Sequence, residues 1–147
     1  ILFEKNGWLS LIFDEENIGF SKDFNVFELQ NALGSKNEIK AYKIAQYFAD
    51  NPKDNPMVVT TSLVFSFFIK LLKYHGLKDK NPKNVASVLG VSPFFLKDYD
   101  VALKNYPMRK VSQIVGSLRE IDVKSKGVGA SLPISDLLKE MLYKIFN

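Results

Sequence analysis

NPMVVTTSLVFSFFIKLLKYHG, residues 55–76, is the stretch that decides the fold. Asn55 is expected to cap a helix that begins at Pro56, because proline has no N–H to lose there and its φ is already helical. Gly76 is expected to end this helix in a left-handed conformation, which glycine adopts without steric cost. Apolar residues between these ends leave almost no polar face, so the helix must be surrounded by other helices or lie in lipid.

A membrane span is the less favoured of these two interpretations. A span needs about 20 predominantly apolar residues. Here hydroxyl residues dilute the stretch between positions 60 and 66, and Lys70 and Lys73 close it. The sequence therefore predicts the central helix of a soluble bundle, without membrane contact.

Length and composition fit one globular domain. The 147 residues are enough for a sizeable core, and 46% hydrophobic with 24% charged residues is an ordinary balance. The chain has no cysteine, which excludes disulfides and thiolate metal sites and fits a reducing compartment such as the cytoplasm. The net charge of +4 is compatible with a nearby nucleic acid. Arg109 and Arg119 are the only arginines, which disfavours a protein that reads base edges through arginine forks.

Helical signals recur from Asn25 to the end of the chain. Asn25 is expected to cap a helix that stops at Gly34, and Ser35 to cap the next, in which Ile39 and Tyr42 are expected to be buried. Caps, stops and apolar residues at 3–4 spacing predict further helices in addition to the central one, over residues 25–33, 35–50, 81–90, 92–105, 107–124 and 131–146.

The predicted class is all-α, an irregular helical bundle with a short, poorly defined N-terminal segment. Residues 25–147 are expected to form the helical domain. Residues 1–24 fit no helix of this bundle, and are a remnant of a preceding domain, a connector or an artificial extension.

No motif in the sequence indicates catalysis or a cofactor. His75 is the only histidine, which excludes multi-histidine metal sites, and its place at the end of the central helix favours a dipole contact or exposure to solvent. Neither GxxxxGK[ST] nor GxGxxG is present, so no nucleotide site is predicted. The consecutive carboxylates of residues 14–16 do not converge on one point and indicate a solvated turn. We therefore expect no catalytic residue, no cofactor, no metal and no small-molecule substrate.

Residues 85–96, VASVLGVSPFFL, have the pattern of a helix-turn-helix unit. The first turn of the second helix, Pro93-Phe94-Phe95, is apolar and cannot form hydrogen bonds with a base edge, which favours a packing corner. A helix-turn-helix DNA-binding protein remains the alternative. Basic residues of the 107–124 helix and its exit loop are candidates for nonspecific DNA contact, namely Arg109, Lys110, Arg119, Lys124 and Lys126.

Several segments, taken in their order, are similar to one family. Residues 17–34 (NIGFSKDFNVFELQNALG) contain a phenylalanine-x-leucine pair followed closely by Ala-Leu-Gly, and a Lys40-Ala41 helix comes next. Residues 89–97 (LGVSPFFLK) and the step from Asp122 to Lys126-Gly127 continue the pattern. The sequence resembles the C-terminal domain of the delta subunit of the bacterial DNA polymerase III clamp loader.

This resemblance implies a non-enzymatic collar domain that follows AAA+-like N-terminal domains. Collar domains of the clamp-loader subunits pack into a ring, so the implied partners are the delta-prime and gamma/tau-type subunits. Primed DNA is contacted through the assembled complex, and weakly at most by this domain alone. A small helical enzyme is the third and least favoured reading.

Exposed apolar helix faces would then carry the function. The candidates for the subunit interface lie on the last helix, and are Leu137, Leu138, Met141 and Leu142. The same stripe at helical spacing is equally compatible with burial in the chain's own core.

Overall fold

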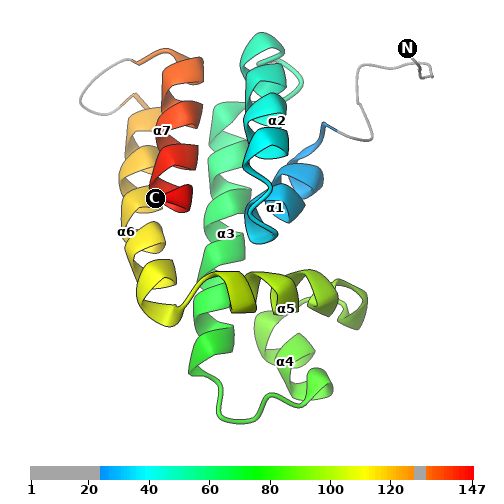
Figure 1. The fold of residues 1–147 in the computed structure, drawn as a ribbon. Helices are drawn as coiled ribbons and strands as arrows, with labels where there is room; N and C mark the ends of the chain where they lie inside the picture. The colour runs from blue at the N-terminus through cyan, green and yellow to red at the C-terminus, as the bar shows by residue number, and fades with distance from the viewer. Residues whose placement is uncertain (1–23, 128–131) are drawn as a thin grey trace, which may run out of the picture.

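The computed structural model describes residues 24–127 and 132–147 (Figure 1). In these two ranges the chain forms α-helices and one 3₁₀ turn, and no strand, so the all-α prediction is confirmed. The predictions for residues 1–23, including the acidic turn at 14–16, lie outside the described residues. The elements are α1 (Val26–Gly34), α2 (Glu38–Asp50), α3 (Met57–Gly76), α4 (Pro82–Leu89), η1 (Pro93–Phe95), α5 (Leu96–Asn105), α6 (Met108–Ser125) and α7 (Ile134–Phe146).

The central helix is α3, which runs through the middle of the molecule (Figure 1). It packs against α1, α4, α5 and α6, and its side chains at Val64, Phe67, Phe68 and Leu71 are buried. By length and composition, with a mean hydropathy of 1.5, α3 is the one described helix that could cross a membrane. Its buried face among four other helices is the arrangement of a core helix in a soluble bundle.

Both ends of α3 differ from the prediction in detail. The helix begins after Pro56, and the side-chain amide of Asn55 donates to the carbonyl of Asn51 (3.2 Å). Gly76 is still helical, because the chain leaves α3 through extended backbone at the next residue and needs no left-handed turn. The left-handed glycine (φ 68°) is Gly90, at the end of α4.

One face of α3 is uncovered, so the expectation of a helix surrounded on all sides was wrong there. Val58, Val59 and Leu63 are 42%, 50% and 37% exposed. Thr60 and Thr61 are buried instead, and the Thr61 hydroxyl donates to the Met57 carbonyl within the helix (2.8 Å). A hydroxyl that bonds to its own helix can be buried without another partner.

Gly34 was expected to stop α1, but it lies inside the helix and in the core. A Cβ at this position would lie 3.3 Å from the Cβ of Ala102 and 3.4 Å from the Phe67 ring. Glycine is therefore needed for the close approach of α1 to α5 and α3.

The turn between α1 and α2 is made by Lys36 and Asn37. Lys36 takes the left-handed conformation (φ 57°). The Asn37 N–H donates to the carbonyl of Ala32 (2.8 Å), which ends α1. Asn37, not Ser35, caps α2, through a hydrogen bond from the Lys40 N–H (3.2 Å). The Ser35 hydroxyl donates back to α1 and is therefore engaged elsewhere.

Side chains at the end of α5 form hydrogen bonds with carbonyls at the end of α1. The buried hydroxyl of Tyr106 donates to the carbonyl of Leu33, and the side-chain amide of Asn105 donates to that of Gly34 (2.9 Å). These bonds satisfy carbonyls that the end of a helix leaves without partners. Burial, with a smaller effect of the Glu38 charge, raises the pKa of Tyr106 and keeps its hydroxyl neutral as a donor.

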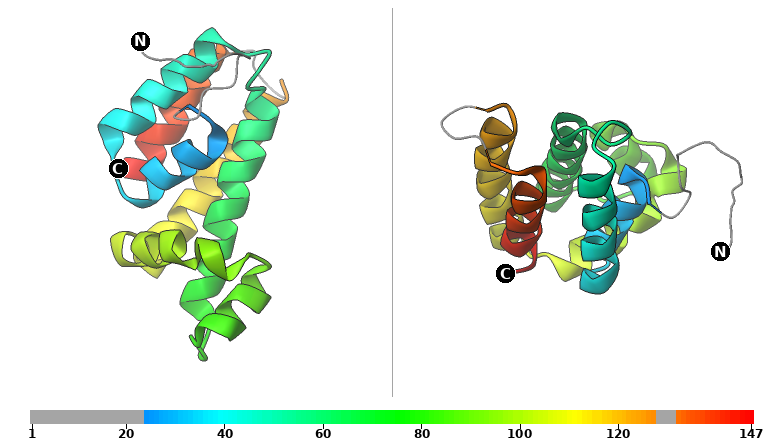
Figure 2. Two further views of the ribbon diagram at one scale, coloured as in Figure 1. Left: turned by 90° about the vertical axis from the view of Figure 1, so that its right-hand side faces the viewer. Right: turned by 90° about the horizontal axis from the view of Figure 1, so that it is seen from above.

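Helix α7 packs against both α2 and α6 (Figure 2). The apolar stripes predicted for α6 and α7 are buried over most of their length, which confirms their helical period, but Val123 at the end of the α6 stripe is 43% exposed. Ile39 and Tyr42 of α2 are 74% and 36% exposed, so the prediction that they are buried was wrong. Ile39 lies on the side of α2 opposite its core residues, and Tyr42 lies at the edge of the core face, three residues before the buried Ala45.

Candidate functional site

Among the described residues, two of the exposed apolar surfaces combine side chains from more than one element. The first is a groove with a volume of about 270 Å³ between α1, α3 and the start of α5. We call it the groove, and its main lining residues are Phe27, Gln30, Leu63, Ser66, Lys70, Val91 and Phe95.

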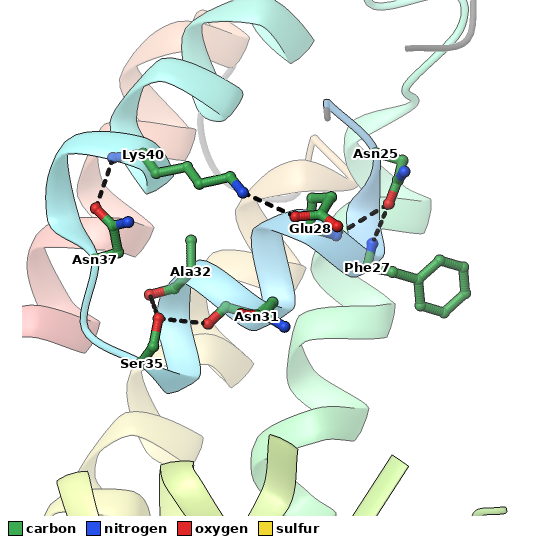
Figure 3. A network of polar contacts seen from close by, with 8 residues as sticks. All are labelled: Asn25, Phe27, Glu28, Asn31, Ala32, Ser35, Asn37 and Lys40. Atoms are coloured by element: carbon green, nitrogen blue, oxygen red, sulfur yellow. Dashed lines mark hydrogen bonds and ion pairs between the residues drawn. The ribbon is translucent and has the colours of Figure 1, made fainter. Parts of the chain in front are cut away.

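The first wall of the groove depends on the cap of α1. The side-chain oxygen of Asn25 accepts hydrogen bonds from the N–H groups of Phe27 (2.9 Å) and Glu28 (3.0 Å) (Figure 3). The predicted cap is thus confirmed, and it starts the helix so that the Phe27 ring points away from α1 and is 64% exposed (Figure 3). The Glu28 carboxylate pairs with Lys40 of α2 (2.9 Å), which fixes α1 against α2.

The opposite wall is the corner between α4 and α5. Gly90 turns the chain in the left-handed conformation, and the Ser92 hydroxyl oxygen accepts from the Phe94 N–H (3.3 Å) at the start of η1. Phe94 and Phe95 are 83% and 47% exposed. The turn that would face the bases in a helix-turn-helix protein therefore presents two aromatic rings.

The floor and the charge of the groove limit what it can bind. The rings of Phe67 and Tyr99 form this floor, tilted by 36° to one another with centroids 4.9 Å apart. Lys70 is the one charged residue in its lining, among the residues that the structure describes. Pockets for small molecules usually hold about 300–1,000 Å³, so the groove, at about 270 Å³, is near the lower end of this range and can also hold a few side chains.

The second surface, which we call the aromatic patch, consists of Ile39 and Tyr42 of α2 with Tyr143 and Phe146 of α7. The rings of Tyr42 and Phe146 lie 6.3 Å apart across the two helices, and Tyr143 is 60% exposed. Ile39 and Tyr143 each lie three residues before one of these rings, and so are its neighbours on the helix surface.

The four interface candidates on α7 lie in the chain's own core. They are 0–3% exposed, at positions 137, 138, 141 and 142, between α2 and α6. The face of α7 that remains accessible is therefore the other one, with the exposed Tyr143 and the partly buried Phe146. Sequence analysis identified the helix but could not assign its two faces.

The five candidate DNA contacts do not converge. Lys124 pairs with Glu140 (3.1 Å), and Lys126 pairs with Asp122 (3.0 Å). Arg109 and Arg119 are exposed but ten residues apart, which is about 15 Å along a helix. Lys110 is partly buried next to Arg109 at the start of α6, so the five residues form a dispersed set and not a basic patch.

His75 has a structural role that the sequence did not reveal. Its Nε2 donates to the carbonyl of Tyr106 (2.7 Å) and so joins the end of α3 to the end of α5. Among the described residues, no group of histidine and acidic residues could hold a metal ion.

The described residues form an all-α fold with a packed core and uncovered apolar surfaces. The sequence matches the family described as DNA polymerase III delta subunit, C-terminal domain, over residues 23–133, and the chain belongs to this family. The resemblance found in the sequence is thereby confirmed. The matched range contains the whole groove and ends directly before α7. Comparisons with curated proteins and with solved structures gave no match.

Proposed function

We propose that this chain is the collar, or oligomerisation, domain of a delta subunit and contributes to assembly of the clamp loader. That complex places the sliding clamp on primed DNA during replication in the cytoplasm. The partners of the domain are the delta-prime and gamma/tau-type subunits. The domain has no catalytic role and contacts DNA weakly at most.

The observation that carries this proposal is the aromatic patch on α2 and α7. Exposed apolar side chains grouped on one surface mark contact sites with other proteins, and tyrosine and phenylalanine are enriched there. With the inner face of α7 buried in the core, we place the subunit interface on its outer face, at Tyr143 and Phe146.

DNA recognition by the α4–α5 corner is the alternative, and its geometry is unfavourable. The first turn after Ser92 exposes phenylalanine rings in place of hydrogen-bond donors. The candidate cations on α6 are dispersed, and two of them are paired with carboxylates. Neither surface supports a sequence-specific or tight DNA complex.

Co-migration with the other clamp-loader subunits on a sizing column, at low and moderate salt, tests the proposal. We expect a stable mixed complex that is lost in Tyr143→Glu. The matched control is Met108→Glu, because Met108 is also apolar and exposed (51%) but lies outside the patch. A chain that ignores these subunits but shifts a duplex oligonucleotide would overturn the proposal in favour of the helix-turn-helix alternative.

A further inference from the structure

The uncovered face of α3 extends beyond the groove at both ends. Residues on this face are alternately four and three positions apart, which places them in one stripe along the helix. The stripe consists of Val59, Leu63, Ser66, Lys70 and Lys73. Its middle part, from Leu63 to Lys70, lines the groove. The groove is therefore the centre of a longer surface, about 21 Å from Val59 to Lys73.

The stripe changes from apolar to positively charged along α3. Val59 and Leu63, at one end, are 50% and 37% exposed. At the other end, neither Lys70 nor Lys73 forms an ion pair within the described part of the chain. None of the described acidic residues lines the groove, and Asp98 lines a separate hollow of about 90 Å³. A complementary partner must therefore present apolar side chains at one end and carboxylates at the other.

Two aromatic rings flank the middle of the stripe. Phe27 of α1 and Phe95 of η1 are 64% and 47% exposed, and both line the groove with Leu63. Exposed apolar side chains from three elements around one hollow mark a contact site. Since the stripe continues for about 21 Å, it suits a segment of a polypeptide better than a small molecule.

The backbone of the covering segment limits its conformation. An extended segment on this apolar surface would bury N–H and C=O groups, and the described residues form no strand whose edge could pair with them. A helix pairs these groups internally and can lay its apolar face in a hydrophobic groove. The covering segment is therefore an amphipathic helix.

The dipole of that helix sets its direction. Carboxylates stabilise the first turn of a helix and are unfavourable in its last turn. Here they must lie beside Lys70 and Lys73, near the C-terminal end of α3. The N-terminus of the covering helix therefore lies at this end, and the helix runs antiparallel to α3.

We propose that the groove and the stripe bind an amphipathic helix of a partner protein, with an acidic first turn and apolar following turns. The acidic turn contacts Lys70 and Lys73. The apolar side chains pack against Leu63, Phe27 and Phe95. This site goes beyond the proposed subunit contact and does not rest on it, because the groove and the aromatic patch share no residue.

A fluorescein-labelled peptide of about 16 residues, long enough to form a helix, tests the site. It has glutamates in its first turn and leucines at heptad spacing in the following turns. Fluorescence anisotropy should show saturable binding to the chain, and Leu63→Glu should weaken this binding at least about tenfold. The milder Leu63→Ala replaces this variant if circular dichroism shows that it does not fold. Met108→Glu, at an exposed position outside the groove, should bind like the unchanged chain.

The charge and the direction have their own tests. Lys70→Glu should weaken binding several-fold, and a peptide with lysines in place of the glutamates should bind Lys70→Glu more tightly than the unchanged chain. A peptide with the glutamates in its last turn should bind the unchanged chain several-fold more weakly. The proposal is overturned if the first peptide does not bind, if it binds all variants equally, or if the position of its glutamates has no effect.

Further measurements distinguish this site from the subunit interface. Peptide binding is measured without other subunits, and Tyr143→Glu should leave it unchanged. Leu63→Glu should still co-migrate with the clamp-loader subunits if the unchanged chain does. Loss of that complex would assign the groove to the subunit contact, and self-association abolished by Leu63→Glu would assign it to a second copy. Either result would overturn the proposal.

Discussion

The groove and the aromatic patch are both apolar and exposed, but they differ in shape and charge. The groove has a volume of about 270 Å³ and a cation in its lining, whereas the hollow beside Tyr42 in the patch has about 10 Å³. A hollow receives a few side chains from a short segment, while a surface without one gains affinity only over a broad contact with another folded surface. The two surfaces therefore differ in what they can accept: the groove can hold a few side chains of a short segment, and the patch can contact another folded surface.

The largest expected effect is the difference in stability between substitutions on the buried face of α7 and substitutions on its exposed face, which is part of the aromatic patch. Leu142 is fully buried and Tyr143 is 60% exposed. Leu142→Ala should lower the free energy of unfolding by about 2–5 kcal/mol, whereas Tyr143→Ala should change it by less than about 0.5 kcal/mol. Urea denaturation of both variants measures the difference. Equal losses would show that the patch is part of the core and would remove it as a candidate interface.

The next prediction concerns Gly34, which sets how closely α1, one wall of the groove, packs against α5 and α3. Gly34→Val forces side-chain atoms against Ala102 and Phe67, and overpacking of this kind should cost about 1–3 kcal/mol of unfolding free energy. The same substitution at Gly116, where nothing lies within 4 Å, should stay within about 0.5 kcal/mol. Urea midpoints of the two variants give the comparison. Equal urea midpoints for the two variants would contradict the close packing of α1 against α5 at Gly34.

Alkaline pH should lower the free energy of unfolding through the buried tyrosines Tyr74 and Tyr99. Burial, and then the hydrogen bond to Asp100, raise the pKa of Tyr74 to about 12, and burial followed by the Asp98 charge raises that of Tyr99 to about 12. A tyrosine is neutral below its unfolded pKa of about 10, so this stabilisation is complete there. It is lost as pH rises through the folded pKa, because ionisation then favours the unfolded chain.

Tyr74→Phe isolates one of these groups. Loss of its hydrogen bond to Asp100 should cost about 1 kcal/mol at neutral pH. Stability of this variant should then fall less steeply between about pH 10 and 12. Urea midpoints across this range provide the measurement, and an unchanged slope would contradict the role of Tyr74.

The smallest effect is expected at Lys124, on the surface away from the groove. Its pair with Glu140 is partly solvated, and pairs of this kind contribute about 0–1 kcal/mol. Lys124→Ala should therefore change the urea midpoint little and leave duplex DNA affinity unchanged. A clear loss of duplex binding would instead restore the α6 cations as a nucleic-acid contact.

The sequence predicted the helices because each carries its own local signals. Asn25 and Asn81 cap the helices they precede, as expected from their side-chain oxygens. The stripes of α6 and α7 are apolar at helical spacing and are buried as predicted. These features depend on residues within a turn or two of one another, so they can be read without the fold.

Errors arose where a residue's role depends on a distant partner. A glycine at position 34 is typical of a helix stop, but its role is to leave room for Ala102 of α5, which packs closely against it. His75 has no local partner, and its bond to the Tyr106 carbonyl exists only because α3 and α5 end side by side. Ile39 has an apolar side chain, but α2 turns it to the surface.

The amino-acid sequence by itself determined the all-α class, the helix order and the family, since local periodicity and ordered motifs are properties of the chain alone. The tertiary structure decided which apolar residues are core and which are surface. It buried residues 137, 138, 141 and 142 and left Phe27, Leu63 and Phe95 around one hollow. Burial depends on which helices meet, and that is set by packing across long sequence distances, which no local pattern contains.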